Sequence, residues 1–182
     1  MSKLRKNNVE KYLRHFAESV IKKGKQILKA KGKEGKLSNS FKYRLESTNE
    51  GYNLVFKAAD YATFVDKGVS GTKTTRTYHN VFGKRQRSPF SYKPYPTGLG
   101  ANIGALEKWI SRKGIKGRDK KTGKFIKTKS LAYLFSKSIQ RKGLAATSFF
   151  SKPMSVELAK FDTEILKNFK ADVITHFETI EL

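Results

Sequence analysis

DYATFVDKGVSG, at residues 60–71, is the most distinctive stretch of this chain. Small, aromatic and aliphatic residues follow one another over its first half, and Gly68 and Gly71 come after them. This composition predicts a short strand or a strand-like turn over residues 61–66, which the glycines close. A second distinctive stretch, KGLAATSFFSKP at residues 142–153, joins two predicted helices through a turn at its aromatic pair.

The sequence before residue 60 predicts one helix and one β-hairpin. Apolar residues recur at helical spacing between residues 3 and 31, opposite a lysine-rich face. Glycines end this pattern, so residues 1–36 are expected to form an N-terminal helix and a flexible joint. Two segments of alternating polarity, residues 41–45 and 52–56, are rich in aromatic residues. They predict an antiparallel hairpin with one buried face.

The sequence after residue 71 predicts a long loop and three helices. Residues 72–100 show no periodicity and are expected to form an extended basic and aromatic loop. A helix follows at about residues 102–112, and a second runs from Ser130, as its N-cap, to Gly143. The final helix is expected over residues 153–182. Its apolar side comprises Val156, Phe161, Ile165, Leu166, Phe169, Val173, Ile174 and Phe177.

Length and composition favour one α+β domain over residues 1–182, since this is the usual size of a single domain. We expect a small antiparallel sheet packed against the N-terminal helix, two middle helices and the long C-terminal helix, with the long basic loop as an insertion. The chain contains no cysteine, which excludes disulfides and cysteine zinc sites. No apolar run approaches the ~18 residues that span a bilayer, and the first residues are charged. We therefore expect a protein that is neither secreted nor embedded in a membrane.

The net charge of +24 is unevenly distributed along the sequence. Residues 101–145 contain 13 Lys or Arg and 2 Asp or Glu, and residues 69–100 contain 6 Lys or Arg and no acid. The final segment, residues 146–182, contains 4 Lys or Arg and 6 Asp or Glu. Concentrated positive charge attracts either a polyanion or an acidic protein neighbour.

The sequence offers little for catalysis. His15, His79 and His176 have no second histidine at ligand spacing, so no zinc or iron site is expected. Asp60 and Asp66 lack a partner for acid-base chemistry, and Asp66 is interpreted as a solvated strand end. No complete phosphate-binding glycine loop is present. We therefore expect neither an enzyme nor a cofactor.

Basic residues with interleaved aromatic residues are the one pattern with a direct binding activity. Cations neutralise phosphates and rings stack on bases, but Arg and Tyr also anchor protein interfaces. For the long loop we favour a subunit contact over nucleic acid, and for the lysine face of the first helix we favour simple solvation. The candidates for subunit or DNA contact are Lys84, Arg85, Arg87, Phe90, Tyr92, Lys93, Lys116, Arg118, Lys120, Lys121 and Lys124.

The two distinctive stretches together resemble the tail-completion and head-tail joining (neck, connector) proteins of tailed bacteriophages. In that family, a tyrosine-alanine, aromatic, valine-acid, glycine motif precedes a later aromatic-aromatic, proline turn into the last helix. The matching residues are Tyr61, Ala62, Phe64, Val65, Gly68, Gly143, Phe149, Phe150 and Pro153. The resemblance implies structural roles for them, at a sheet edge and at the turn into the last helix. The long insertion after Gly71 departs from the family pattern.

The resemblance also implies a function, partners and a location. Copies are expected to form a closed ring, six- or twelvefold, around the DNA channel of the virion neck. Portal or adaptor proteins and tail proteins are the expected neighbours, with additional non-specific contact to packaged DNA and synthesis in the cytoplasm of the bacterial host. The alternative, from charge alone, is a basic nucleic-acid-binding or packaging protein.

Overall fold

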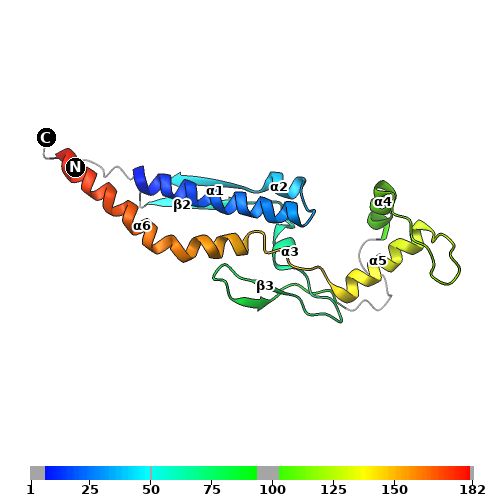
Figure 1. Cartoon of the computed structure of the whole chain (residues 1–182). Coiled ribbons are helices and arrows are strands. Elements are labelled where there is room, and N and C mark those ends of the chain that lie inside the picture. The colour runs from blue at the N-terminus through cyan, green and yellow to red at the C-terminus, as the bar shows by residue number, and fades with distance from the viewer. Residues whose placement is uncertain (1–6, 50, 94–102, 181–182) are drawn as a thin grey trace. The chain divides into compact units, whose positions relative to one another are not determined.

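A computed structural model describes residues 7–49, 51–93 and 103–180, and the fold is α+β as expected (Figure 1). The described chain contains six helices and two small antiparallel two-stranded sheets. The chain divides into two compact units. The first comprises residues 1–66, 79–86 and 147–182, and the second comprises residues 67–78 and 87–146.

The first unit is built around two long helices, α1 (Asn7–Ala30) and α6 (Ser151–Ile180). Helix α1 packs on α6 and also on a β-hairpin, as Figure 1 shows. Rings from both helices interlock: the Phe16 and Phe161 centroids are 5.3 Å apart in an edge-to-face arrangement. The helical spacing of apolar residues in the sequence therefore correctly predicts both helices. Residues 3–6 and the side chain of Phe177 lie outside the described part.

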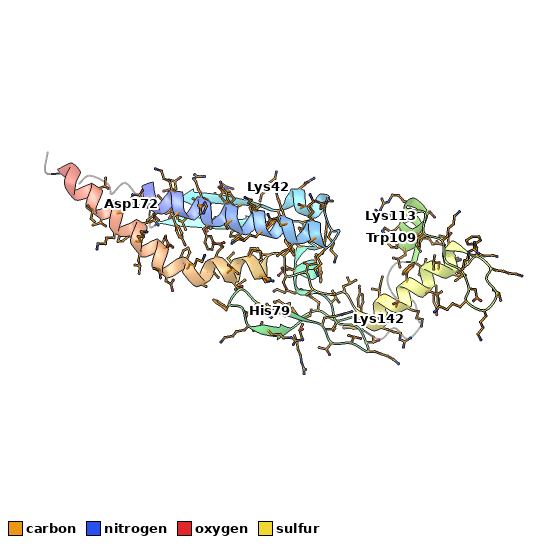
Figure 2. The ribbon with its side chains drawn as sticks, in the orientation of Figure 1. Lys42, His79, Trp109, Lys113, Lys142 and Asp172 are labelled. Carbon is orange, nitrogen blue, oxygen red and sulfur yellow. The ribbon has the colours of Figure 1, made fainter. Side chains whose placement is uncertain are left out.

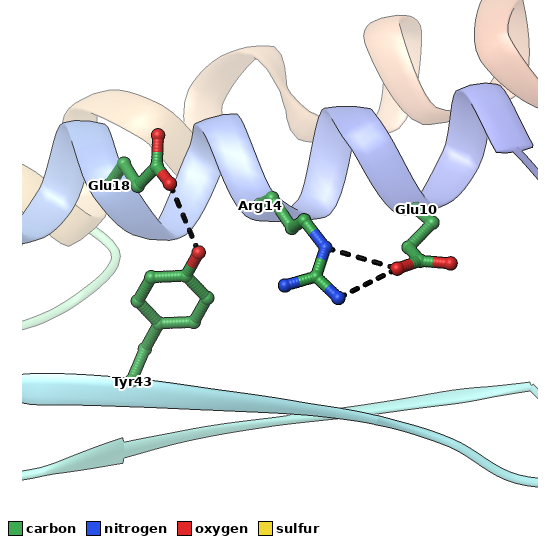
Figure 3. Close-up of polar contacts among 4 residues, drawn as sticks. All are labelled: Glu10, Arg14, Glu18 and Tyr43. Atoms are coloured by element: carbon green, nitrogen blue, oxygen red, sulfur yellow. Dashed lines mark hydrogen bonds and ion pairs between the residues drawn. The ribbon is translucent and has the colours of Figure 1, made fainter.

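The predicted hairpin is confirmed. Strand β1 (Lys42–Ser47) pairs antiparallel with β2 (Tyr52–Lys57), in a register that places Tyr43 opposite Phe56. Figure 3 shows Tyr43 reaching α1, where its hydroxyl donates a hydrogen bond to Glu18 at 3.1 Å. The same figure shows Arg14 paired with Glu10 at 2.7 Å on the exposed surface of α1.

A short helix that the sequence analysis missed, α2 (Lys36–Ser40), precedes this hairpin. It begins inside the segment interpreted as a flexible joint. Its one buried side chain, Leu37, is 3% exposed and belongs to the core cluster. Five residues are too few for a helical period to be visible in sequence.

The core of the first unit is an aromatic cluster. Phe41 and Phe149 are 2% and 1% exposed, and their centroids are 5.4 Å apart, edge to face. Gly24 of α1 makes room for them, because a Cβ at this position would lie 2.7 Å from the Phe149 carbonyl oxygen and 2.7 Å from the Phe41 ring. Helix-interior glycine is normally unfavourable, so close packing explains this one.

The expectation of a strand over residues 61–66 is wrong, since this segment forms helix α3 (Ala62–Lys67). The Val65 N–H donates to the Tyr61 carbonyl at 3.2 Å, a helical bond. Ala62 and Val65, three residues apart, both pack against the core. Aromatic and β-branched residues favour strands, but in so short a segment the helical spacing of the core contacts overrides this preference.

The segment interpreted as a long loop contains a second hairpin, β3 (Thr77–His79) and β4 (Arg85–Arg87). Its turn lies at residues 80–83, where the Gly83 N–H donates to the Asn80 carbonyl at 2.9 Å. The Asn80 side-chain oxygen accepts hydrogen bonds from the N–H groups of Phe82 and Lys84, at 3.0 and 2.9 Å. Three-residue strands are too short to show alternation, whereas an Asx turn is visible in sequence. Residues 94–100 lie outside the described part.

The second unit contains helices α4 (Ile103–Lys113) and α5 (Thr128–Lys142), which pack together. Trp109 of α4, labelled in Figure 2, meets Phe135 of α5 edge to face at 5.9 Å. The expected N-cap at Ser130 is wrong: the N-cap is Lys127, three residues earlier, and the helix begins at Thr128. The expected end at Gly143 is confirmed, with φ of 68°.

Candidate interaction surfaces

The two distinctive stretches lie against each other in the folded chain, although about eighty residues separate them in sequence. In the first unit, the Thr147 N–H donates to the Val65 carbonyl at 3.0 Å, and the Ser148 N–H donates to the Asp66 carbonyl at 3.0 Å. Tertiary hydrogen bonds of this length fix the backbone that enters α6.

Asp66 caps α6 through space. Its carboxylate accepts hydrogen bonds from the backbone N–H groups of Phe150, at 2.8 Å, and Ser151, at 3.2 Å, and from the Ser151 hydroxyl. These N–H groups lie at the N-terminal end of the helix, where no intrahelical acceptor exists and where negative charge is favourable. Asp66 is 4% exposed, so its interpretation as a solvated strand end is wrong.

In the second unit, the same two stretches cross at glycines. Val69 and Leu144 exchange two backbone hydrogen bonds, at 2.9 and 2.8 Å. A Cβ on Gly143 would lie 2.0 Å from the Val69 carbonyl oxygen, and one on Gly68 would lie 2.7 Å from the Leu144 carbonyl oxygen. Both glycines also have positive φ, of 68° and 71°. Only glycine allows two backbones to approach this closely.

The other residues of the resemblance divide between core and surface. Phe149, Phe150, Ala62 and Val65 belong to the core or pack against it, and Pro153 is buried in the first turn of α6. The side chains of Tyr61 and Phe64 are 42% and 43% exposed. The expected turn before the last helix is therefore present, while the expected sheet edge is a helix.

The first group of predicted contact residues combines exposed cations with two partly buried rings. Lys84, Arg85 and Arg87 are exposed on or beside β4. Phe90 and Tyr92 are half-buried, and burial raises the pKa of the Tyr92 hydroxyl. Their backbones bracket Ser70, which donates to Phe90 and accepts from Tyr92 at 2.8 and 2.9 Å. These two rings are thus part of the packing. Lys93 is exposed.

The second group lies on one ordered turn, which we call the basic hairpin (residues 117–126). The Ile126 N–H donates to the Gly117 carbonyl, and the Asp119 N–H donates to the Lys124 carbonyl, both at 2.9 Å. Arg118, Lys120, Lys121 and Lys124 are exposed on this hairpin, and Lys116 is exposed just before it.

Asp119 organises the tip of the basic hairpin. Its carboxylate accepts hydrogen bonds from the backbone N–H groups of Thr122, at 2.8 Å, and Lys121, at 2.9 Å, and from the Thr122 hydroxyl, at 3.1 Å. These bonds hold the pKa of Asp119 below its usual value. The only acid of the hairpin is therefore a structural element of its turn.

Phe125, Asp119 and Asp172 have roles in the structure that were not predicted from the sequence. The Phe125 ring is 61% exposed, and the Arg118 guanidinium lies 4.4 Å from its centroid. Asp172, labelled in Figure 2, is 2% exposed and caps α1, accepting hydrogen bonds from the N–H groups of Asn8 and Val9 at 2.9 and 3.0 Å. In the sequence, Asp172 is recognisable as a single acid that falls on the otherwise apolar face of α6.

No group of three or more His, Asp or Glu residues that could hold a metal ion occurs among the described residues. None of the described helices is long and apolar enough to cross a membrane.

No known protein family, curated protein or solved structure matches the chain.

Proposed function

We propose that this chain is a structural protein of the neck of a tailed bacteriophage, forming with its copies a ring between portal and tail around the DNA channel. One observation carries the proposal. The two stretches that resemble the neck family bond to each other along their length, through Asp66 and the turn at Phe149 in one unit and through Gly68 and Gly143 in the other. Residues that a shared fold requires are expected to meet in this way.

The surface also carries apolar side chains of the kind that contact neighbouring subunits. Leu166, Phe169 and Val173 follow one face of α6 at steps of three and four residues, and the first two are 65% and 46% exposed. A closed ring requires two different, complementary surfaces on each subunit. An apolar face on α6 and a basic face on the second unit fit that requirement.

A role in assembly requires no catalytic group, so we propose that the chain is not an enzyme. Its expected partners are its own copies, a portal or adaptor protein and tail proteins, and its expected location is the virion.

The test is cryo-electron microscopy of intact virions produced from a genome that encodes this chain, with mass spectrometry of the same particles. Density for the chain in a ring at the portal vertex is the expected result. A particle that lacks the chain would refute the neck role and favour the alternative, a nucleic-acid-binding or packaging protein.

A further inference from the structure

The segment around the basic hairpin is rich in exposed positive charge. Residues 113–129 contain eight Lys or Arg and one acid, Asp119. All eight basic side chains are exposed, and none takes part in the ion pairs found among the described residues. The acid is held by three hydrogen bonds from Lys121 and Thr122.

The cations are carried on an ordered backbone. The Arg118 and Phe125 backbones form an antiparallel bridge, and Gly123, with φ of 66°, closes the turn. Behind the hairpin, Gly117 lies close to the side chain of Leu131 on α5. A turn that is ordered before binding loses less conformational entropy when its lysines meet a ligand.

Phe125 positions the one arginine of the hairpin. The ring lies 4.4 Å from the Arg118 guanidinium and 6.0 Å from the Lys116 ammonium group. Stacking of this kind restricts the guanidinium plane and leaves its N–H donors available for phosphate oxygens.

We propose that the basic hairpin is a binding site for the phosphate backbone of nucleic acid. Lysine is depleted in protein interfaces, and three of the four cations on this hairpin are lysines, so a phosphodiester backbone fits better than an acidic protein. One exposed ring is too few for a track of stacked bases, so a duplex fits better than a single strand. Contacts to phosphates carry no sequence information, so binding is independent of sequence. The inference does not depend on the neck role.

The test compares two triple variants of the full chain. K120Q/K121Q/K124Q removes three cations from the hairpin, and K11Q/K22Q/K29Q removes three exposed cations from α1. Fluorescence anisotropy with a short duplex DNA, and with a duplex RNA of the same length, gives the dissociation constant over a range of salt concentrations. Because each phosphate contact contributes ~0.9 to the slope of log K against log salt, the hairpin variant should lower that slope by about 2.7 for DNA.

The expected result is a loss of at least about tenfold in DNA affinity near 0.1 M salt for the hairpin variant and a much smaller loss for the α1 variant. Equal binding of DNA and RNA would show that the hairpin recognises the phosphate backbone of either duplex. Binding of DNA alone would show that the hairpin recognises only a backbone in the B-form. Equal losses in the two variants would overturn the proposal, because net charge alone would then explain binding. An absence of DNA binding by the wild type at that salt would also overturn it and assign the hairpin to an acidic protein.

A second measurement does not depend on variants. Acetylation of lysines in the wild type, with and without duplex DNA, should show protection of Lys120, Lys121 and Lys124. Lys11, Lys22 and Lys29 should react equally in both samples. The reverse pattern would contradict the assignment.

Discussion

Replacing Asp66 by alanine should destabilise the first unit far more than the loss of an exposed acid. The substitution removes the acceptor of two backbone N–H groups, those of Phe150 and Ser151, and of the Ser151 hydroxyl, in a site where the aspartate is 4% exposed. A buried donor left without a partner costs ~1–3 kcal/mol. We therefore expect D66A to lower the free energy of unfolding by about 3 kcal/mol.

Asparagine at the same position separates hydrogen bonding from charge. Its amide oxygen can accept both N–H bonds and its amide group can donate to the serine hydroxyl, so D66N loses only the interaction of a negative charge with the helix N-terminus. That loss is ~1 kcal/mol or less. D60A is the matched control, since Asp60 is exposed in the same stretch, and it should change stability by less than ~0.5 kcal/mol.

The assay is urea unfolding followed by far-ultraviolet circular dichroism. With a slope of about 2 kcal/mol per molar urea, a loss of 3 kcal/mol lowers the midpoint by about 1.5 M. Hydrogen exchange should show faster exchange of the Phe150 and Ser151 amides in D66A. A loss below ~1 kcal/mol in D66A, or equal losses in D66A and D66N, would refute the capping argument.

Three further predictions concern packing, pH and assembly. Gly24→Ala should destabilise the chain by ~1–3 kcal/mol in urea unfolding, although alanine normally favours helix, because its Cβ would press on the Phe149 carbonyl. Burial alone raises the pKa of Glu157, but hydrogen bonds from a lysine and a serine of α1 hold it below its usual value. An acid whose pKa is lower in the folded than in the unfolded state stabilises the fold at pH values above its unfolded pKa. E157Q should therefore lower the free energy of unfolding by ~1 kcal/mol at neutral pH. This difference from the wild type should vanish as the pH falls through the folded pKa of Glu157. L166K/F169K should reduce the mass of the assembly in analytical ultracentrifugation while its thermal midpoint stays constant, since both side chains are exposed.

The sequence was most informative about long, periodic elements. The apolar spacing of α1 and α6 and the alternation of β1 and β2 correspond to faces that the fold buries. The prediction of secondary structure failed for short elements, where the local conformational preference of the residues differs from the conformation that their tertiary contacts require. Helix α3 carries strand-forming residues, yet its core contacts at Ala62 and Val65 are three residues apart.

The candidate site shows the same division. Lysines of the basic hairpin could be identified from composition alone, because a surface charge run needs no partner to be recognised. The order of that hairpin depends on Asp119, which sequence alone presents as one acid among many cations. Asp66 and Asp172 could not be assigned, since their hydrogen-bond partners lie 84 and 163 residues away in sequence.

The placement of the acids explains why so much positive charge remains available for a partner. Asp66 and Asp172 are buried at the N-termini of α6 and α1, where helices need acceptors, and Asp119 closes a turn. Glu157 is held by Lys23 and Ser19. These carboxylates serve the fold, each fixed to a donor of this chain. The lysines of the basic hairpin have no such partner within the described chain. They therefore remain available to the phosphate backbone that we propose as their ligand.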